Sequence, residues 1–285
     1  MRLIKTVFAA HDFSPASRNA LEIAAGIAKK TGSKLYIYHV VSTSALTDNE
    51  SVYVYSPEQD IKKSSALMRR GITYLKKKFP GVHIAFEVDF GFLVPAITDK
   101  VAELQPWLAV VGVKKRTGLD RVIFGDICTT LIGKLRCPML VVPLNYKSLK
   151  LNTIAYAWDG KTPETQHLSV LKELLPAEKT NIIALNVTHY DADVERNLPA
   201  FKSGLKKLFP NHSTDLQQVQ GLDKETEFEK AVRKINPDLL VVYAHHYNIW
   251  QNMFHKRFSK HALKFSQSPV VVISEQESAA KATSH

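Results

Sequence analysis

The feature that most constrains this chain is an internal repeat. Three pairs of segments recur at offsets of 130 or 131 residues: Leu75–Pro80 with Leu205–Pro210, Trp107–Val111 with Asp238–Val242, and Pro138 with Pro269. A chain that repeats its own pattern at a fixed spacing is built from copies of one structural unit. The sequence therefore predicts two successive domains, 1–145 and 151–275, followed by a polar, unpatterned tail at 276–285 that is expected to be disordered.

Within each copy, short apolar runs alternate with segments of helical periodicity. In the first copy the expected strands are Thr6–Ala10, Leu35–Val41, Val82–Val88, Leu108–Val111 and Met139–Val142. Ser14-Pro15 supplies an N-cap and a first-turn proline for the helix after the first strand. In the second copy, Thr153–Ala157 and Asn181–Val187 are the first two strands, and Thr162-Pro163 is expected to open the helix between them. Strands that alternate with helices predict an α/β fold with a parallel sheet covered on both faces.

The composition is that of a folded globular protein. The length of 285 residues suits two domains, and 45% apolar with 23% charged residues is close to the globular average. No apolar run approaches the roughly 18–20 residues of a membrane span, so we expect a cytoplasmic protein without a membrane partner. The cysteines Cys128 and Cys137 lie neither in a CxxC spacing nor beside a matching set of histidines, so neither a disulfide framework nor a zinc knuckle is expected.

The chain carries an excess of positive charge. Lysine and arginine outnumber aspartate and glutamate by 38 to 27, a net charge of +11. Such an excess is compatible with an anionic partner such as nucleic acid, a nucleotide or a membrane surface. The basic residues are spread over both halves and are not interleaved with aromatic residues that would stack on bases, which favours a solvated basic surface. A nucleic-acid-associated function is therefore the least favoured hypothesis. It predicts an affinity for nucleic acid that falls steeply as salt is added.

The first copy carries a recognisable set of motifs: Asp12-Phe13-Ser14, His39-Val40-Val41, the loop Gly112–Asp126 and the run Cys137–Pro143. With these motifs, residues 1–145 resemble the universal stress protein family, and the corresponding marks of the second copy are Asp159 and Pro269–Ile273. The resemblance implies two tandem Rossmann-like, doubly wound domains, each an open five-stranded parallel sheet flanked by helices. Ligands of such sheets bind at the carboxyl ends of strands where the strand order reverses, so Asp12 and Gly112 should border a crevice.

The loop of the first copy departs from the pattern of ATP-binding family members. That pattern is Gly-x-x-Gly, nine residues, and then Gly-Ser or Gly-Thr, whose bare backbone lets phosphates approach. Here Lys115 replaces the second glycine, and its ammonium group could contact a phosphate. Asp126 replaces the Ser or Thr, and its carboxylate at the start of a helix would repel a phosphate. The resemblance implies a degenerate crevice for an adenine nucleotide, in which Asp12 holds the nucleoside. Its candidate residues are Asp12, Val41, Gly112, Lys115, Gly125 and Asp126.

The second copy has lost the glycines of this loop. The positions of Gly112, Lys115, Gly125 and Asp126 are taken by Tyr243, His246, Lys256 and Arg257. ATP is therefore possible in the first domain only, and the ligand of the rebuilt loop at 243–255 is left open. Four histidines near this loop, His245, His246, His255 and His261, are not accompanied by acidic or thiol ligands in the loop, so no metal site is expected.

Two functions from different classes lead. The first is a stress-response binding or regulatory protein that acts through protein partners, has no catalytic residues and has weak or lost ATP binding. The second is an ATP-binding switch or slow ATPase that uses the crevice of the first domain. In this family the fifth strands commonly pair across a dimer. We therefore expect Met139–Val142 to meet Val270–Ile273 in an intramolecular pseudo-dimer, with a further homodimer as an option.

Overall fold

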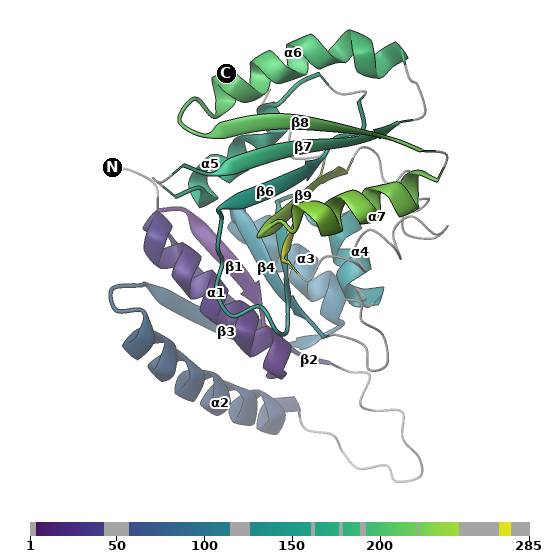
Figure 1. Ribbon diagram of the computed structural model, residues 1–285. Coiled ribbons are helices and arrows are strands. Elements are labelled where there is room, and N and C mark those ends of the chain that lie inside the picture. The colour runs from purple at the N-terminus through teal and green to yellow at the C-terminus, as the bar shows by residue number, and fades with distance from the viewer. Residues whose placement is uncertain are drawn as a thin grey trace, which may run out of the picture.

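The computed structural model describes residues 4–42, 57–114, 126–160, 163–176, 179–188, 192–221, 223–244 and 268–274. Within these residues, ten strands form one sheet with helices packed on both faces (Figure 1). The strands are β1 (Thr6–Ala10), β2 (Lys34–Ser42), β3 (Ile84–Gly91), β4 (Leu108–Val113), β5 (Met139–Pro143), β6 (Thr153–Ala157), β7 (Asn181–Thr188), β8 (Ser213–Gln220), β9 (Leu239–Ala244) and β10 (Val270–Ser274). The helices are α1 (Pro15–Thr31), α2 (Pro57–Lys78), α3 (Leu93–Leu104), α4 (Asp126–Lys134), the 3₁₀ helix η2 (Gln166–Ser169), α5 (Val170–Leu174), α6 (Ala192–Leu208) and α7 (Lys224–Ile235).

The topology of the sheet repeats the internal duplication. The strand order is β3-β2-β1-β4-β5-β10-β9-β6-β7-β8, so each half has the same order of five parallel strands. Val7 of β1 lies opposite Leu108 of β4, and Ile154 of β6 lies opposite Leu239 of β9. These two pairs occupy matching positions of the repeat, so the halves share one register. The expected doubly wound α/β fold is confirmed.

Strands β5 and β10 join the two halves. They pair antiparallel, with Val141 opposite Val270 and Leu140 opposite Val271, and these four side chains are buried. The contact between the fifth strands that the sequence analysis expects is therefore present. It merges two five-stranded parallel sheets into one continuous sheet.

Two layers of apolar side chains hold the helices on the sheet. Side chains alternate along β1, so that Val7 and Ala9 enter one core cluster and Phe8 enters the other. The first cluster is shared with α1, α2, α5 and α6, and the second with α3, α4 and α7. Each cluster contains residues of both halves. Figure 1 shows α2 beside β3 at one end of the sheet and α6 beside β8 at the other.

The ends of α1 follow from local residue chemistry. Ser14 is the N-cap, and its hydroxyl oxygen accepts a hydrogen bond from the Ser17 backbone N–H at 3.2 Å. Pro15 stands in the first turn, where its missing N–H costs nothing. Gly32 ends the helix in the left-handed conformation at φ 64°, which a glycine adopts without steric cost. The helix therefore starts where the sequence predicts and ends at a glycine suited to the C-cap.

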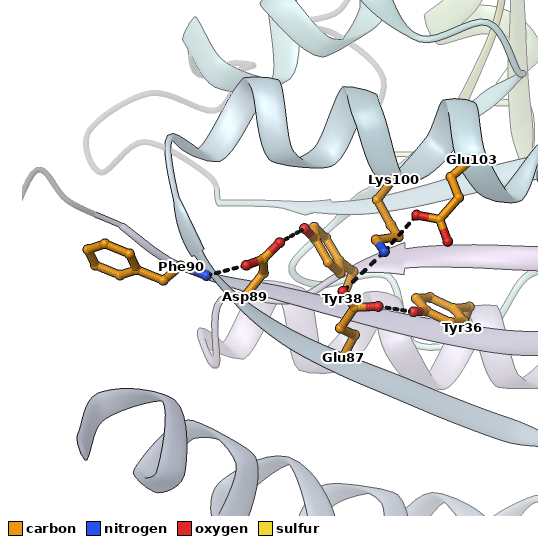
Figure 2. A network of polar contacts seen from close by, with 7 residues as sticks. All are labelled: Tyr36, Tyr38, Glu87, Asp89, Phe90, Lys100 and Glu103. Atoms are coloured by element: carbon orange, nitrogen blue, oxygen red, sulfur yellow. Dashed lines mark hydrogen bonds and ion pairs between the residues drawn. The ribbon is translucent and has the colours of Figure 1, made fainter. Parts of the chain in front are cut away.

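A polar network ties α3 to the outer strands of the first half (Figure 2). Tyr36 and Tyr38 of β2 donate hydrogen bonds to Glu87 and Asp89 of β3, the latter at 2.8 Å. Lys100 of α3 lies 3.1 Å from a carboxylate oxygen of Glu87, and it also bonds to Glu103 of its own helix. Burial and the Glu87 carboxylate raise the pKa of Tyr36 to about 12, so its hydroxyl stays protonated as a donor. The network fixes α3 across the β2–β3 pair.

Two expectations of local structure are corrected. The helix expected to open at Thr162-Pro163 does not start there, because Pro163–Thr165 is described as non-helical and η2 begins at Gln166. The strand expected at Val82–Val88 begins at Ile84 instead. Gly81, with φ 87°, prolongs the turn after α2, and Val82 donates a backbone hydrogen bond to the Phe79 carbonyl. None of the described helices combines the length and apolar character needed to span a membrane.

Candidate functional site

The candidate crevice lies at the carboxyl ends of the neighbouring strands β1 and β4. Ala9 pairs with Val110, so Asp12, just after β1, and Gly112, near the end of β4, are brought to the same edge of the sheet. Strand β2 extends past β1, and Val41 near its end pairs with Phe90 of β3. Asp126 is the exposed first residue of α4. The two other predicted crevice residues, Lys115 and Gly125, lie outside the described residues.

Asp12 is exposed and is held ionised by its neighbours. Its carboxylate accepts a hydrogen bond from the Ser14 backbone N–H at 2.9 Å. Partial burial raises the pKa of the Asp12 carboxyl, but the hydrogen bonds from Ser14 and Ser17 outweigh burial, so the pKa lies below its ordinary value. The site therefore presents a fixed negative acceptor at the N-terminal end of α1.

Two histidines flank the loop that carries Asp12. The ring of Phe13 lies edge-on to His11 and His39, with centroid distances of 4.8 Å and 4.5 Å. Phe13 has φ 60°, a left-handed conformation that costs a side-chain-bearing residue roughly 1–2 kcal/mol, so these ring contacts hold a strained loop. His39 Nδ1 lies 2.7 Å from the His11 carbonyl oxygen, which can only accept, so Nδ1 carries the proton. In the neutral ring His39 Nε2 is then an acceptor.

His11 gives the crevice region a predictable response to acid. Burial lowers the pKa of His11 to about 4, and its Nδ1 has no hydrogen-bond partner in the described part of the chain. In the unfolded chain the His11 ring takes up a proton near pH 6.5, whereas in the folded chain it does so only near pH 4. The free energy of unfolding therefore falls as the pH falls through this window. We expect this residue to remove about 2 kcal/mol of the free energy of unfolding between pH 6 and pH 4.5.

Urea denaturation at several pH values tests this expectation. The His11→Leu variant should lose that part of the acid dependence, while the lowered pKa of His39 contributes a remaining slope of the same sign. The matched control is His83→Leu, the same replacement at a histidine whose side chain is exposed. An identical acid slope in His11→Leu and the unmodified chain would contradict the assignment.

Gly112 is required by packing between β4 and α1. A Cβ atom at this position would lie 2.3 Å from the Ala16 carbonyl oxygen and 2.7 Å from the Ser17 backbone nitrogen. The strand and the first turn of the helix therefore touch backbone to backbone. The motif predicts that this glycine gives phosphates access to the backbone, whereas the structure supplies a packing reason for it on the side facing α1.

The second half places Tyr243 where the first half has Gly112. The shared register of β9 and β4 makes the two positions equivalent. The Tyr243 ring stacks on His167 of η2 at a centroid distance of 3.9 Å, and His167 Nε2 lies 2.9 Å from the hydroxyl oxygen of the buried Tyr156. The strand position that meets the first turn of α1 in the first half therefore carries a side chain that contacts η2 in the second half. The late start of η2 follows, because a helix backbone cannot lie against a tyrosine as it lies against a glycine.

The loop after β6 is packed onto α6. Trp158 and Phe201 are buried and stack in parallel at a centroid distance of 4.2 Å. Gly160 has φ 82°, and a Cβ atom there would lie 2.2 Å from Val194 Cγ2. Asn197 donates a hydrogen bond to the Gly160 carbonyl at 3.0 Å. The loop that carries Asp159 is thus held against a helix by aromatic and polar contacts.

A model of the universal stress protein family matches residues 4–143. These residues form the first half of the sheet and carry the candidate crevice. Residues 4–143 therefore form a domain of the universal stress protein family. A universal stress protein of Methanocaldococcus jannaschii is 26% identical over 142 residues, which are 49% of this chain and 82% of that protein.

The universal stress protein fold extends over both halves. The solved structure of a universal stress protein from Archaeoglobus fulgidus has a TM-score of 0.72 at 15% identity, covering 94% of this chain and 98% of that one. A functionally unknown protein from Pseudomonas aeruginosa has a TM-score of 0.60 at 12% identity, with 98% of each chain covered. At these identities the likeness establishes the fold alone.

One contact in the second half has no signal in the sequence. The stack of His167 on Tyr243 joins η2 to β9, two elements far apart in the sequence, and no spacing rule connects them. Cys128 and Cys137 are buried and form no disulfide within the described part of the chain. Among the described residues, no group of three or more His, Cys, Asp or Glu side chains could hold a metal. The histidines His245, His246, His255 and His261 lie outside the described ranges.

Proposed function

We propose that this chain is a stress-response binding protein of the universal stress protein family, in which the N-terminal half carries the ligand crevice. One observation carries the proposal: equivalent register positions hold Gly112 in the first half and Tyr243 in the second. In the first half the edge after β1 carries an exposed, ionised carboxylate. In the second half aromatic side chains occupy the corresponding region. Binding of a ligand in the first half would then regulate how the whole two-domain chain interacts with its partners.

The phosphate end of this crevice is poorly suited to ATP. Asp126 begins α4, so its carboxylate lies at a helix N-terminus, where an anion such as a phosphate would otherwise be favoured. The same carboxylate repels an incoming anion, and at a few ångströms such repulsion is worth several kcal/mol at a moderate effective dielectric constant. We therefore propose weak or lost ATP binding in this half.

A second candidate is a nucleotide-dependent switch or slow ATPase in the same crevice. The favouring observation is the nucleoside end, where Asp12 is ionised and His39 Nε2 is an acceptor in the neutral ring. Both groups suit a ligand that donates hydrogen bonds, such as a ribose hydroxyl or an exocyclic amine. If only the phosphate end is impaired, adenosine and ATP should bind with similar, weak affinity.

The pairing of β5 with β10 supports an intramolecular pseudo-dimer. The two fifth strands bury Leu140, Val141, Val270 and Val271 at the centre of the sheet. Each half thereby satisfies an edge strand that would otherwise expose unpaired backbone groups. We propose domain limits of 1–145 and 151–275, with the connection between them at the start of β6.

Calorimetric titration with ATP and Mg²⁺, repeated with adenosine, tests the proposed function. We expect weak or undetectable binding of ATP to the unmodified chain and at least a tenfold gain in affinity in Asp126→Ser, since one repelling charge is removed. Lys115→Gly separates the contribution of the lysine from that of the carboxylate. The matched control is Asp193→Ser at the start of α6, which removes the same charge from a helix in the other half.

Each outcome of this titration selects one function. Micromolar binding of ATP by the unmodified chain would contradict the binding-protein proposal and would favour the nucleotide switch. An Asp126→Ser variant that binds ATP no better than Asp193→Ser would show that Asp126 is not what closes the crevice.

A further inference from the structure

A pocket lies between the two halves, lined by the C-terminal part of α1, the end of α2, the segment 147–151 and the end of α5. Its volume is about 270 Å³. Helix α1 begins at Pro15, beside the crevice, and the pocket is lined by its residues from Glu22 to Thr31. Because α1 covers parallel strands from their carboxyl ends back toward their amino ends, the pocket is separate from the crevice that begins at Asp12. We call it the junction pocket.

The wall of the junction pocket is apolar. Ile23 and Ile27 of α1, Leu151 of the connection and Leu174 of α5 are buried, and Phe79 after α2 is half-buried. Gly26 also lines the pocket, and a Cβ atom added there would lie 3.7 Å from the Phe79 ring, in ordinary van der Waals contact. The absence of a side chain at Gly26 therefore leaves open space beside an aromatic ring.

The rim of the junction pocket is positively charged once its ion pairs are taken into account. Its acidic residues are already paired: Glu22 with Lys78 at 2.7 Å, and Glu173 with Lys5. Lys30 donates a hydrogen bond to the Leu174 carbonyl at 2.8 Å. Lys147 is exposed and forms no salt bridge with any residue in the described ranges.

Lysines outnumber carboxylates in the lining of the pocket, and an apolar wall with a cationic rim suits an amphipathic anion. Its volume of about 270 Å³ lies just below the roughly 300–1,000 Å³ usual for ligand pockets, which suits a short chain with a charged head group. We propose that the junction pocket binds a small monocarboxylate with a short apolar chain, whose carboxylate pairs with Lys147. This inference goes beyond the proposed function and does not depend on nucleotide binding in the crevice.

Such a ligand would touch both halves at once. Its chain would lie between Ile27 of α1 and Leu174 of α5, which belong to different copies of the repeat. Binding would therefore add a connection between the halves besides the β5–β10 pairing, and would stabilise the folded chain by mass action.

Calorimetric titration of the full chain with sodium octanoate tests the proposal, with 1-octanol and octylammonium as probes of the head group. We expect octanoate to bind with a stoichiometry of one, octanol at least tenfold more weakly, and octylammonium more weakly still. Absence of octanoate binding at millimolar concentration would overturn the proposal. Equal binding of octanoate and octanol would also overturn it, because the lysines would then have no role.

Two pairs of variants locate the site. Lys147→Glu should weaken octanoate binding at least tenfold, and Lys147→Gln less, since the first reverses the charge and the second removes it. Gly26→Leu should abolish binding by filling the pocket, whereas Gly71→Leu on the open surface of α2 should leave it intact. Gly26→Ala, which fits the available space, controls for folding and should still bind. Retained binding in Gly26→Leu would place octanoate elsewhere and overturn the proposal.

Discussion

Replacing Phe201 with alanine is expected to lower the free energy of unfolding by about 3–5 kcal/mol. Phe201 projects from α6 with no solvent exposure, and its ring lies nearly parallel to that of Trp158, with an interplanar angle of 5°. It also stacks on Tyr156 at a centroid distance of 6.0 Å. Truncation would leave a cavity between the helix and the sheet and would remove the aromatic contacts that order the loop after β6.

Urea denaturation followed by near-ultraviolet circular dichroism measures both effects, since Trp158 would lose its ordered aromatic neighbour. The matched control is Phe92→Ala, because Phe92 is 73% exposed and its truncation should change stability by no more than about 0.5 kcal/mol. Phe201→Leu should fall between the two. A loss below about 1 kcal/mol in Phe201→Ala would mean that α6 closes over the gap without cost.

Replacing Gly112 with alanine is expected to cost about 3 kcal/mol, the upper end of the usual range for overpacking. The added methyl group would meet the Ala16 carbonyl oxygen and the Ser17 nitrogen, which are backbone atoms of α1. Backbone atoms cannot rotate away as the tip of a flexible side chain can, so relief requires the whole helix to shift from β4. Because α1 also carries the Ser14 cap beside Asp12, the geometry of the crevice should change with it.

Equilibrium denaturation of Gly112→Ala against Gly71→Ala tests this reasoning with the same chemical change at two sites. Gly71 lies in the middle of α2 with no atom within 4 Å of an added Cβ, so its replacement should stabilise the chain by up to about 1 kcal/mol. If both variants were equally stable or both stabilised, close backbone packing at Gly112 would not be what demands a glycine.

Much of the fold could be predicted because the signals are local. The apolar run Thr6–Ala10 is the first strand as expected, and Ser14-Pro15 opens α1. The repeat at matching offsets predicted two equivalent halves, and the strand registers agree with it. Errors arose where a contact distant in sequence intervened: the second half has Tyr243 in place of the packing glycine, and the helix expected at Thr162-Pro163 starts late.

The candidate site was predicted in part. Asp12 and Gly112 do lie at the ends of neighbouring strands, because parallel strands bring their carboxyl ends to one edge. The protonation of His39 at Nδ1 and the unpartnered Nδ1 of His11 could not be predicted, since each depends on which backbone atoms lie nearby in space. Lys115 and Gly125 stay predictions from the motif.

The sequence by itself determined the class of fold, its duplication and the family resemblance of the first half. Hydrophobic periodicity, helix caps and glycine spacing each involve only a few neighbouring residues, so they can be recognised in the sequence alone. Only the tertiary structure decided that the expected contact of β5 with β10 is antiparallel and makes one continuous sheet, that Gly112 lies against the backbone of α1, and that a pocket opens between the halves. The reason is that each of these depends on distances between residues more than 90 positions apart, which the packing of the two halves sets and no local pattern encodes.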